Sequence, residues 1–160
     1  MRRATLAFVA LTLVLVPAPA GAGTTRPPLG LAVTPARVAL AGTGKASVRI
    51  TNPGVGAVVV DVARAGLSLD LRGRPHVVAR PGLRAATSWL TVRPGRFVLP
   101  AGATRWLTVA SRLPRHVEPG DHDALVLLTT RPWRSAGVAV RMRIGVVVVV
   151  RAPGRIVGRP

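Results

Sequence analysis

The sequence predicts an all-β sandwich, because short apolar segments with β-strand alternation recur along the chain and turn residues separate them. Strands of this length, spaced between Gly and Pro turns, are typical of sandwiches and barrels. No segment longer than a turn has the periodicity of an amphipathic helix. The chain has no cysteine, so the fold forms without disulfides. Its length is enough for one domain with a single apolar core.

The first four predicted strands lie in the N-terminal half of the chain. LGLAV (29–33) alternates apolar and small residues and stops before a proline. ASVRITNPG (46–54) alternates and ends in an Asn-Pro-Gly turn. AVVVDVA (57–63) is rich in β-branched valine, and LSLDLRGRP (67–75) alternates leucines before a turn. Alternation and β-branching both favour strands, because side chains on a strand point in turn to its two faces.

Five more strands are predicted in the C-terminal half. WLTV (89–92) and FVLP (97–100) are short and apolar, with a Pro-Gly turn between them. TRWLTVAS (104–111) follows a second turn, ALVLLTT (124–130) follows a third, and VAVRMRIGVVVVVR (138–151) alternates throughout. The expected fold is therefore one sandwich of about seven to nine strands.

The last strand carries the sharpest functional signal. Its core face is expected to hold Val138, Val140, Met142, Ile144, Val146, Val148 and Val150; its opposite face holds Arg141, Arg143, Gly145, Val147, Val149 and Arg151. The two outward valines fit a mid-sheet strand of high β-propensity. They also fit a partner-binding strand, with an exposed edge or a valine patch at Val147 and Val149 and with Arg143 and Arg151 guarding against aggregation. In that second interpretation Arg37 is a candidate anchor for a carboxylate.

The N-terminus predicts export. Arg2 and Arg3 precede an apolar run over 6–16, and Ala20-Gly21-Ala22 fits the cleavage site of a secretory signal peptide. The run is too short for a membrane-spanning helix, and no later segment is a transmembrane anchor. We expect a secreted or envelope-bound protein. The predicted organisation is a signal peptide (1–22), a linker (23–30), the sandwich (31–153) and a basic tail (154–160).

The charge balance is strongly basic. The whole chain carries +18, and removal of Arg2 and Arg3 with the leader leaves 21 basic residues against five acids, or +16. Such a surface attracts polyanions through counterion release. For an exported protein these are anionic cell-wall polymers and lipid headgroups. Nucleic acid is not expected, since the chain has no Tyr and only five aromatic residues to stack bases.

The segment HVEPGDHDA (116–124) concentrates two of three histidines and three of five acids. We interpret it as a turn at Pro119-Gly120, in which Asp121 bonds nearby backbone amides before the next strand begins. The alternative is a weak metal site that would serve a metal-dependent hydrolase from His116 to Asp123. Zinc and calcium sites need more convergent ligands than one loop supplies. The chain also lacks a nucleophile elbow and a phosphate loop. We therefore expect no enzyme activity, catalytic residue, metal or cofactor.

The three tryptophans have different predicted roles. Trp89 heads a strand and is expected to cap the core. Trp106 alternates with Leu107 and is also assigned to the core. Trp133 lies between two strands beside arginines and is the one tryptophan expected to be exposed, as a candidate contact anchor.

A family resemblance rests on the joint order of several segments: VRITNPG (48–54), WLTVRPGRFVLPAGATRWLTVASRLP (89–114), PGDHDALVLL (119–128) and RIGVVVVVRAPG (143–154). The chain resembles immunoglobulin-like domains of the pilus-chaperone type, and specifically the peptidoglycan-binding Ig-like domain of WxL-interacting proteins. The resemblance implies an Ig-like sandwich that associates with wall polymers and surface proteins. Members of that family are longer, with a second domain and a membrane segment.

The resulting functional expectation is an exported, non-catalytic Ig-like domain that binds an anionic wall polymer or an envelope protein, including a second β-domain by strand contact. A first alternative is a pilus-type periplasmic chaperone that donates a strand to surface subunits. In such chaperones a basic pair holds a subunit carboxylate; the resemblance places Arg37 at the arginine of that pair, while no lysine partner is identified. The metal-dependent hydrolase is the second alternative.

Overall fold

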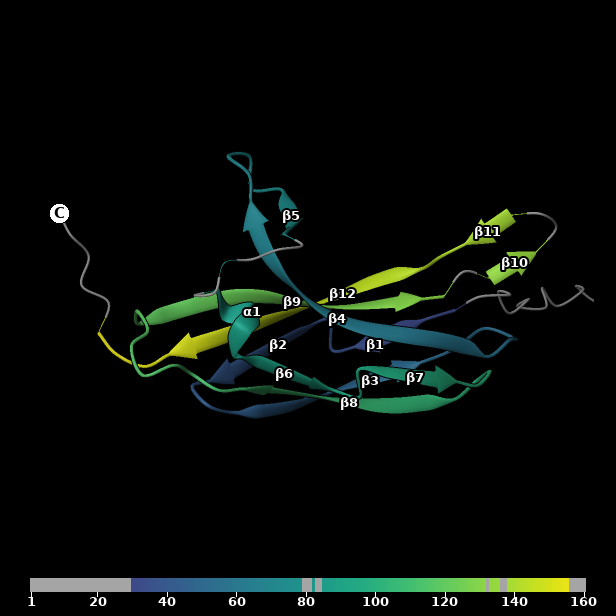
Figure 1. Ribbon diagram of the computed structural model, residues 1–160, viewed down its shortest axis with the longest axis horizontal. Coiled ribbons are helices and arrows are strands. Elements are labelled where there is room, and N and C mark those ends of the chain that lie inside the picture. The colour runs from purple at the N-terminus through teal and green to yellow at the C-terminus, as the bar shows by residue number, and fades with distance from the viewer. Residues whose placement is uncertain (1–29, 79–81, 83–84, 132, 136–137, 156–160) are drawn as a thin grey trace, which may run out of the picture.

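Two sheets pack face to face in the computed structural model and enclose one apolar core (Figure 1). The structure describes residues 30–78, 82, 85–131, 133–135 and 138–155. Sheet A has the strand order β1 (Ala32–Thr34), β3 (Lys45–Thr51), β8 (Thr104–Ser111) and β6 (Leu90–Arg93). Sheet B has the order β2 (Arg37–Ala41), β12 (Arg143–Ala152), β9 (Gly120–Thr130), β4 (Val58–Leu69) and β5 (Pro75–Val78), and β7 (Arg96–Leu99) also pairs with β4. The predicted all-β sandwich is confirmed.

Two smaller elements complete the described chain. The helix α1 (Ala86–Trp89) is one turn that leads directly into β6. The hairpin of β10 (Trp133–Ser135) and β11 (Val138–Val140) forms a separate two-stranded sheet between β9 and β12. In Figure 1 this hairpin extends from one end of the sandwich. The end of β4 projects from the sandwich together with β5 and forms a second arm.

The first strand of the fold is divided between the two sheets. β1 pairs with β3 in sheet A, and after Pro35 the chain crosses and pairs with β12 in sheet B as β2. β2 runs parallel to β12, whereas the other pairs are antiparallel. This crossing closes only part of the sandwich edge.

The core follows the predicted alternation. Val48 and Ile50 of β3, Leu107 and Val109 of β8, and the even-numbered valines from Val146 to Val150 are all fully buried. The largest fully buried side chains are aliphatic: Ile50, Leu90, Leu99, Leu107, Leu128, Val48, Val60, Val109, Val126, Val146, Val148 and Val150. Burial of each such side chain contributes about 1.5–3 kcal/mol, so aliphatic packing between the sheets is the main source of stability.

The structure has more strands than the sequence predicts, twelve among the described residues. The predicted segment 57–63 and the start of the segment 67–75 belong to the single long strand β4, because Gly66 continues the ladder instead of ending it, and the rest of the second segment is the turn into β5. The segment 138–151 is divided into β11 and β12. β2, β5 and β10 are not predicted, although Arg37–Ala41 has a clear pattern of buried Val38 and Leu40 between exposed neighbours.

Candidate partner-binding surface on β12

β12 has two neighbours along only part of its length. Its whole length pairs with β9, but β2 pairs with the second half alone, from Val147 to Arg151. Among the described residues, no ladder partner lies beside Arg143–Val146 on the β2 side. We call these four residues the open stretch. It arises because the chain enters sheet B only at β2, after running along sheet A as β1.

The backbone direction within the open stretch follows from two hydrogen bonds. The Val147 N–H donates to the Ala36 carbonyl at 2.9 Å, so Val147 faces the β2 side. The Thr130 N–H donates to the Met142 carbonyl at 2.9 Å, so Met142 faces β9. Because successive residues face opposite neighbours, Gly145 directs its N–H and carbonyl away from β9. These are the groups that an added strand would bond.

Apolar side chains line both faces beside the open stretch. On the core side, Met142 and Ile144 are only half-buried and pack against the core. On the outer face, a Cβ placed on Gly145 would lie 3.6 Å from Cδ2 of both Leu125 and Leu127, which is ordinary contact. An incoming strand would therefore contact apolar side chains on the core side and, on the outer face, the space that Gly145 leaves without a side chain.

The predicted exposed valine patch is wrong in part. Val149 is only 4% exposed and Val147 is half-buried, although both side chains point to the outer face as predicted. Val149 is flanked by Ala39 of β2 and Asp123 of β9. A strand with a neighbour on each side covers its own outer side chains better than an edge strand does. The second half of β12 is therefore mid-sheet, and the open stretch precedes it.

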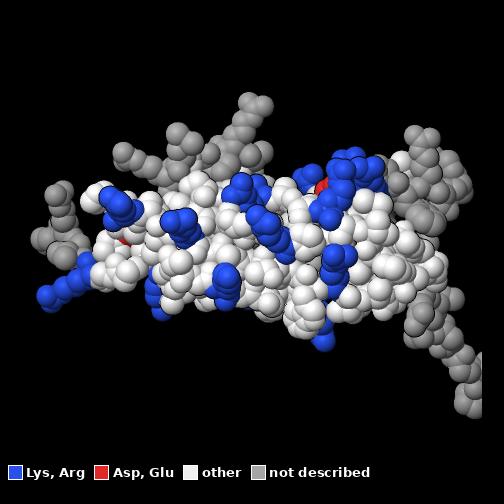
Figure 2. Space-filling model, turned by 60° about the horizontal axis from the view of Figure 1, so that its bottom comes forward, with Lys and Arg blue, Asp and Glu red and all other residues white. Residues whose placement is uncertain are grey.

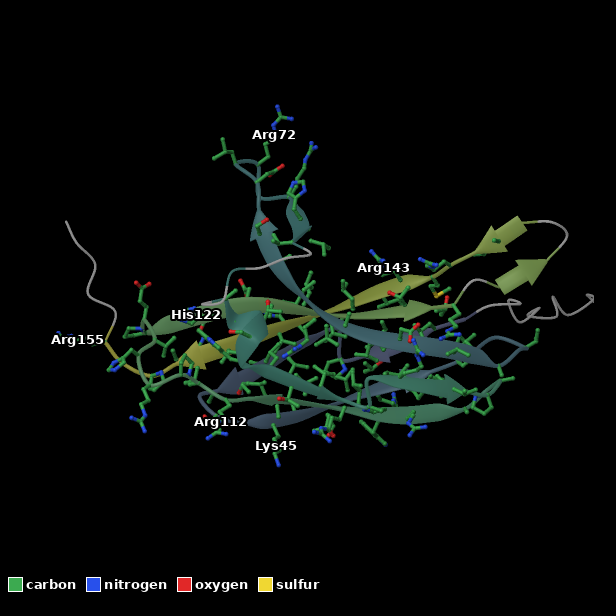
Figure 3. The ribbon with its side chains drawn as sticks, in the orientation of Figure 1. Lys45, Arg72, Arg112, His122, Arg143 and Arg155 are labelled. Carbon is green, nitrogen blue, oxygen red and sulfur yellow. The ribbon has the colours of Figure 1, made fainter. Side chains whose placement is uncertain are left out.

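The predicted arginines have separate places around this strand. Arg143 is exposed at the start of the open stretch, where its Nε donates to Oγ1 of Thr129 at 3.3 Å (Figure 3). Arg37 is exposed beside Val147, at the other end of the open stretch. Arg151 is engaged elsewhere: its Nε and Nη2 donate to Asp121 Oδ1 and Oδ2 at 2.7 and 2.9 Å.

The role predicted for Asp121 is wrong, because its carboxylate accepts hydrogen bonds from the Arg151 side chain rather than from backbone amides. The Arg151 hydrogen bond holds the pKa of the Asp121 carboxyl below its usual range, and the positive charges of Arg151 and Arg37 add to this effect. The positive φ predicted for Gly120 is confirmed at 130°, but the chain only bends at Pro119, and β9 begins at Gly120 rather than at Ala124. A left-handed value of this kind favours glycine.

The two histidines of this segment border an open hollow of about 740 Å³ at the α1 end of the sandwich. The His122 Nε2–H donates a hydrogen bond to the Glu118 carbonyl at 2.8 Å. The His122 ring also contacts the buried Trp89 ring edge-on, with ring centroids 4.8 Å apart. Trp89 thus caps the core as predicted. The side chain of Trp133 lies outside the described residues.

No group of three or more metal-ligating side chains converges within the described part of the chain. One acid of the segment 116–124, Asp121, pairs with Arg151. Asp61 pairs with Arg96 and Arg131, and Asp70 bonds the Arg72 and Arg74 amides at 2.8 Å. The described residues thus offer no donor set for the hydrolase alternative. No helix among them is long and apolar enough to cross a bilayer.

The divided first strand and the two-sheet order define an Ig-like domain of the PapD-like type, and solved structures agree. The periplasmic chaperone SfaE superposes with a TM-score of 0.55 at 14% identity, over 81% of this chain and 61% of SfaE. The CsuC–CsuE chaperone–tip adhesion subunit pre-assembly complex of Acinetobacter baumannii gives 0.57 at 11%, over 78% and 52%. The seventh PapD-like domain of human CEP192 gives 0.52 at 12%, over 92% and 99%.

These likenesses establish the fold alone, because the identities are low. The chain spans little more than half the length of the pilus chaperones it matches, but nearly the full length of the single CEP192 domain. Neither a protein-family model nor a curated protein matches the sequence. The narrower resemblance to WxL-interacting proteins stays a prediction.

Proposed function

We propose that this chain is an exported, non-catalytic Ig-like domain that binds a second β-domain by strand pairing along β12, in the manner of a pilus chaperone. The observation that carries the proposal is the open stretch of β12, where Gly145 directs its backbone groups away from β9. A sheet edge of this kind is a template for strand addition. The structural likeness to a chaperone in complex with its subunit supports the same role.

The strand that binds would continue sheet B next to β12. Its side chains on the core side would cover Met142 and Ile144, which are half-buried here, and its other face would lie beside Leu127. Full burial of the exposed half of two such side chains contributes about 2 kcal/mol to binding. The backbone hydrogen bonds would fix the register of the added strand. Arg143 and Arg37 stand at the two ends of the open stretch, where they suit a carboxylate of the partner.

Gly145→Pro tests this proposal directly. Proline removes the outward N–H and places a ring on the open side, while the ladder between β12 and β9 keeps its hydrogen bonds. The matched control is Gly145→Ala, whose Cβ makes ordinary contacts. Each variant is co-expressed in the periplasm with candidate β-domain subunits encoded next to this chain. Wild type and Gly145→Ala should co-purify with the partner, and Gly145→Pro should not.

Amide hydrogen exchange provides the second measurement. In the free domain the Gly145 amide should exchange fast and the Ile144 amide slowly, because only the latter faces β9. Binding should protect Gly145. Equal co-purification of all three variants, or a protected Gly145 amide in the free domain, would rule out strand pairing at this edge.

A second part of the proposal concerns the envelope itself. The mature charge of +16 supports a salt-dependent attraction to anionic envelope polymers. Binding of the mature domain to cell walls should fall steeply between low and high salt. Binding that does not change with salt would indicate a protein partner alone.

A further inference from the structure

Trp106 is exposed on the outer face of sheet A. Its side chain is 60% exposed, whereas Leu107 and Val109 of the same strand are fully buried. The assignment of Trp106 to the core is therefore wrong. The alternation of β8 could have predicted this exposure, since Trp106 shares its face with the polar Thr104 and Thr108. A large aromatic ring in the middle of a polar sheet surface needs a reason, because tryptophan on a surface is typical of binding sites.

The neighbours of Trp106 are cationic or carry hydroxyl groups. Arg49 of β3 is its direct cross-strand partner, which places their Cβ atoms about 5 Å apart. Next to this pair, the Thr51 and Thr104 hydroxyls are 3.0 Å apart and share a hydrogen bond. On the other side, Thr108 pairs with Arg93 of β6. Arg93 is thus one strand away and about 7 Å along the sheet from the ring.

The outer face of sheet A carries cations and no acid. Lys45, Arg49 and Arg93 are all exposed on it, and Lys45 points away from the sandwich at the bottom of Figure 3. The five carboxylates of the chain are Asp61, Asp70, Glu118, Asp121 and Asp123, and none belongs to a strand of sheet A. In Figure 2, which brings this side of the molecule forward, blue side chains cross the face and red is confined to its margins.

All the described acids that form ion pairs with arginine lie in sheet B, where Asp61 pairs with Arg96 and Arg131 and Asp121 pairs with Arg151. Within the described chain, no ion pair engages Lys45, Arg49 or Arg93. Their positive potential therefore faces solvent without local compensation, which favours an anionic ligand at this face.

We propose that the outer face of sheet A is a binding site for an acidic polysaccharide, centred on Trp106. A sugar ring would stack on the indole, its carboxylate or phosphate would pair with Arg49 or Arg93, and its hydroxyls would bond Ser47 and Thr108. The cations are spread over about 13 Å between Lys45 and Arg49, four residues apart on β3. This spacing suits repeated charges on an extended polymer.

Two other polyanions fit this face less well. Trp106 is the one large apolar side chain exposed on the strands of sheet A, and a lipid surface is held by a wider apolar area. Single-stranded nucleic acid is held by several aromatic rings on which successive bases stack. An acidic glycan needs one stacking ring, hydroxyl partners and cations, and these three are present together.

This inference deepens the polymer part of the proposed function and is independent of strand pairing at β12. General attraction depends on total charge, while the proposed site depends on particular residues. The two are separated by comparing Arg49→Gln/Arg93→Gln with Arg72→Gln/Arg74→Gln. Both double variants remove two charges, but Arg72 and Arg74 are exposed in the connection between β4 and β5. Arg72 lies at the tip of this arm, away from sheet A (Figure 3).

The probe is a polygalacturonate oligomer titrated into the mature domain at physiological salt, with a dextran oligomer as the neutral control and single-stranded DNA as the competing polyanion. Trp106→Ala and Arg49→Gln/Arg93→Gln should each weaken polygalacturonate binding about tenfold, as loss of an anchor side chain does. Arg72→Gln/Arg74→Gln should change it by less than about twofold, as peripheral charges do. Thermal unfolding confirms that each variant is folded.

Three results would overturn the site. Equal weakening by the two double variants would leave general charge attraction only. An unchanged affinity for Trp106→Ala would remove the stacking surface. Tighter binding of DNA, lost in Trp106→Ala, would make the face a nucleic-acid surface. In none of these cases would strand pairing at β12 be affected, so failure of the site and failure of the chaperone-like function are distinguishable.

Discussion

Replacement of Asn52 should be among the most damaging single changes in this domain. Its side chain is fully buried where the turn after β3 meets the end of β7. Nδ2 donates to the carbonyls of Gly56, Leu99 and Pro100 at 2.8, 3.0 and 3.1 Å, and Oδ1 accepts from the Gly54 N–H at 2.9 Å. Asn52 thus fixes one end of the sandwich through polar contacts.

The expected loss for Asn52→Ala follows from these contacts. The bonds to Leu99 and Gly54 are buried, and each contributes about 1.5 kcal/mol when its backbone partner is left unsatisfied. The bonds to Gly56 and Pro100 are partly buried and add about 0.5 kcal/mol each. The free energy of unfolding should therefore fall by about 4 kcal/mol.

Urea denaturation measures this change. With an m-value of about 2 kcal/mol/M, the midpoint should move down by about 2 M. The control is Thr104→Ala, which removes the exposed hydrogen bond to Thr51 and should cost less than about 0.5 kcal/mol. A loss below about 1 kcal/mol for Asn52→Ala would refute the reasoning, because it would mean that water or relaxation replaces the buried bonds.

Three further predictions concern other parts of the chain. Val149→Thr should destabilise by about 1–3 kcal/mol, because it buries a hydroxyl, while Val147→Thr at its half-buried position should cost clearly less in the same urea assay; equal effects would place both valines in one environment. Asp121→Asn should lower the melting temperature at pH 7 but not at low pH. The pKa of Asp121 is lowered by folding, so its contribution is present above the unfolded-state pKa and is lost as the pH falls through the folded-state pKa; a constant difference across this range would contradict the ion pair. Export should yield a product that begins at or near Gly23, checked by intact mass, and a cytoplasmic product that retains Met1 would exclude the signal peptide.

Local pattern was enough to predict most strands and both faces of β12, but the assignment of Val140 to the core face is wrong, because it lies in β11 and is 48% exposed. TRWLTVAS has the predicted bounds of β8, and Val146, Val148 and Val150 are buried as the alternation requires. The reason is that a strand with one buried face must alternate, whatever its neighbours are. The same alternation located the outward-facing side of Val147 and Val149.

Which strands lie next to one another, by contrast, is decided only by the tertiary structure. Alternation assigns a residue to a face, but it does not say which strands flank it or what covers that face. The crossing from β1 to β2 determines that Val149 is covered and that Gly145 borders an open edge. In the same way, the exclusion of every acid from sheet A depends on strand order, since Arg49 and Arg93 come together only because β3 and β6 both pair with β8. The sequence by itself determined a basic, all-β chain and predicted its export, and long-range strand pairing decided which of its surfaces we propose for binding.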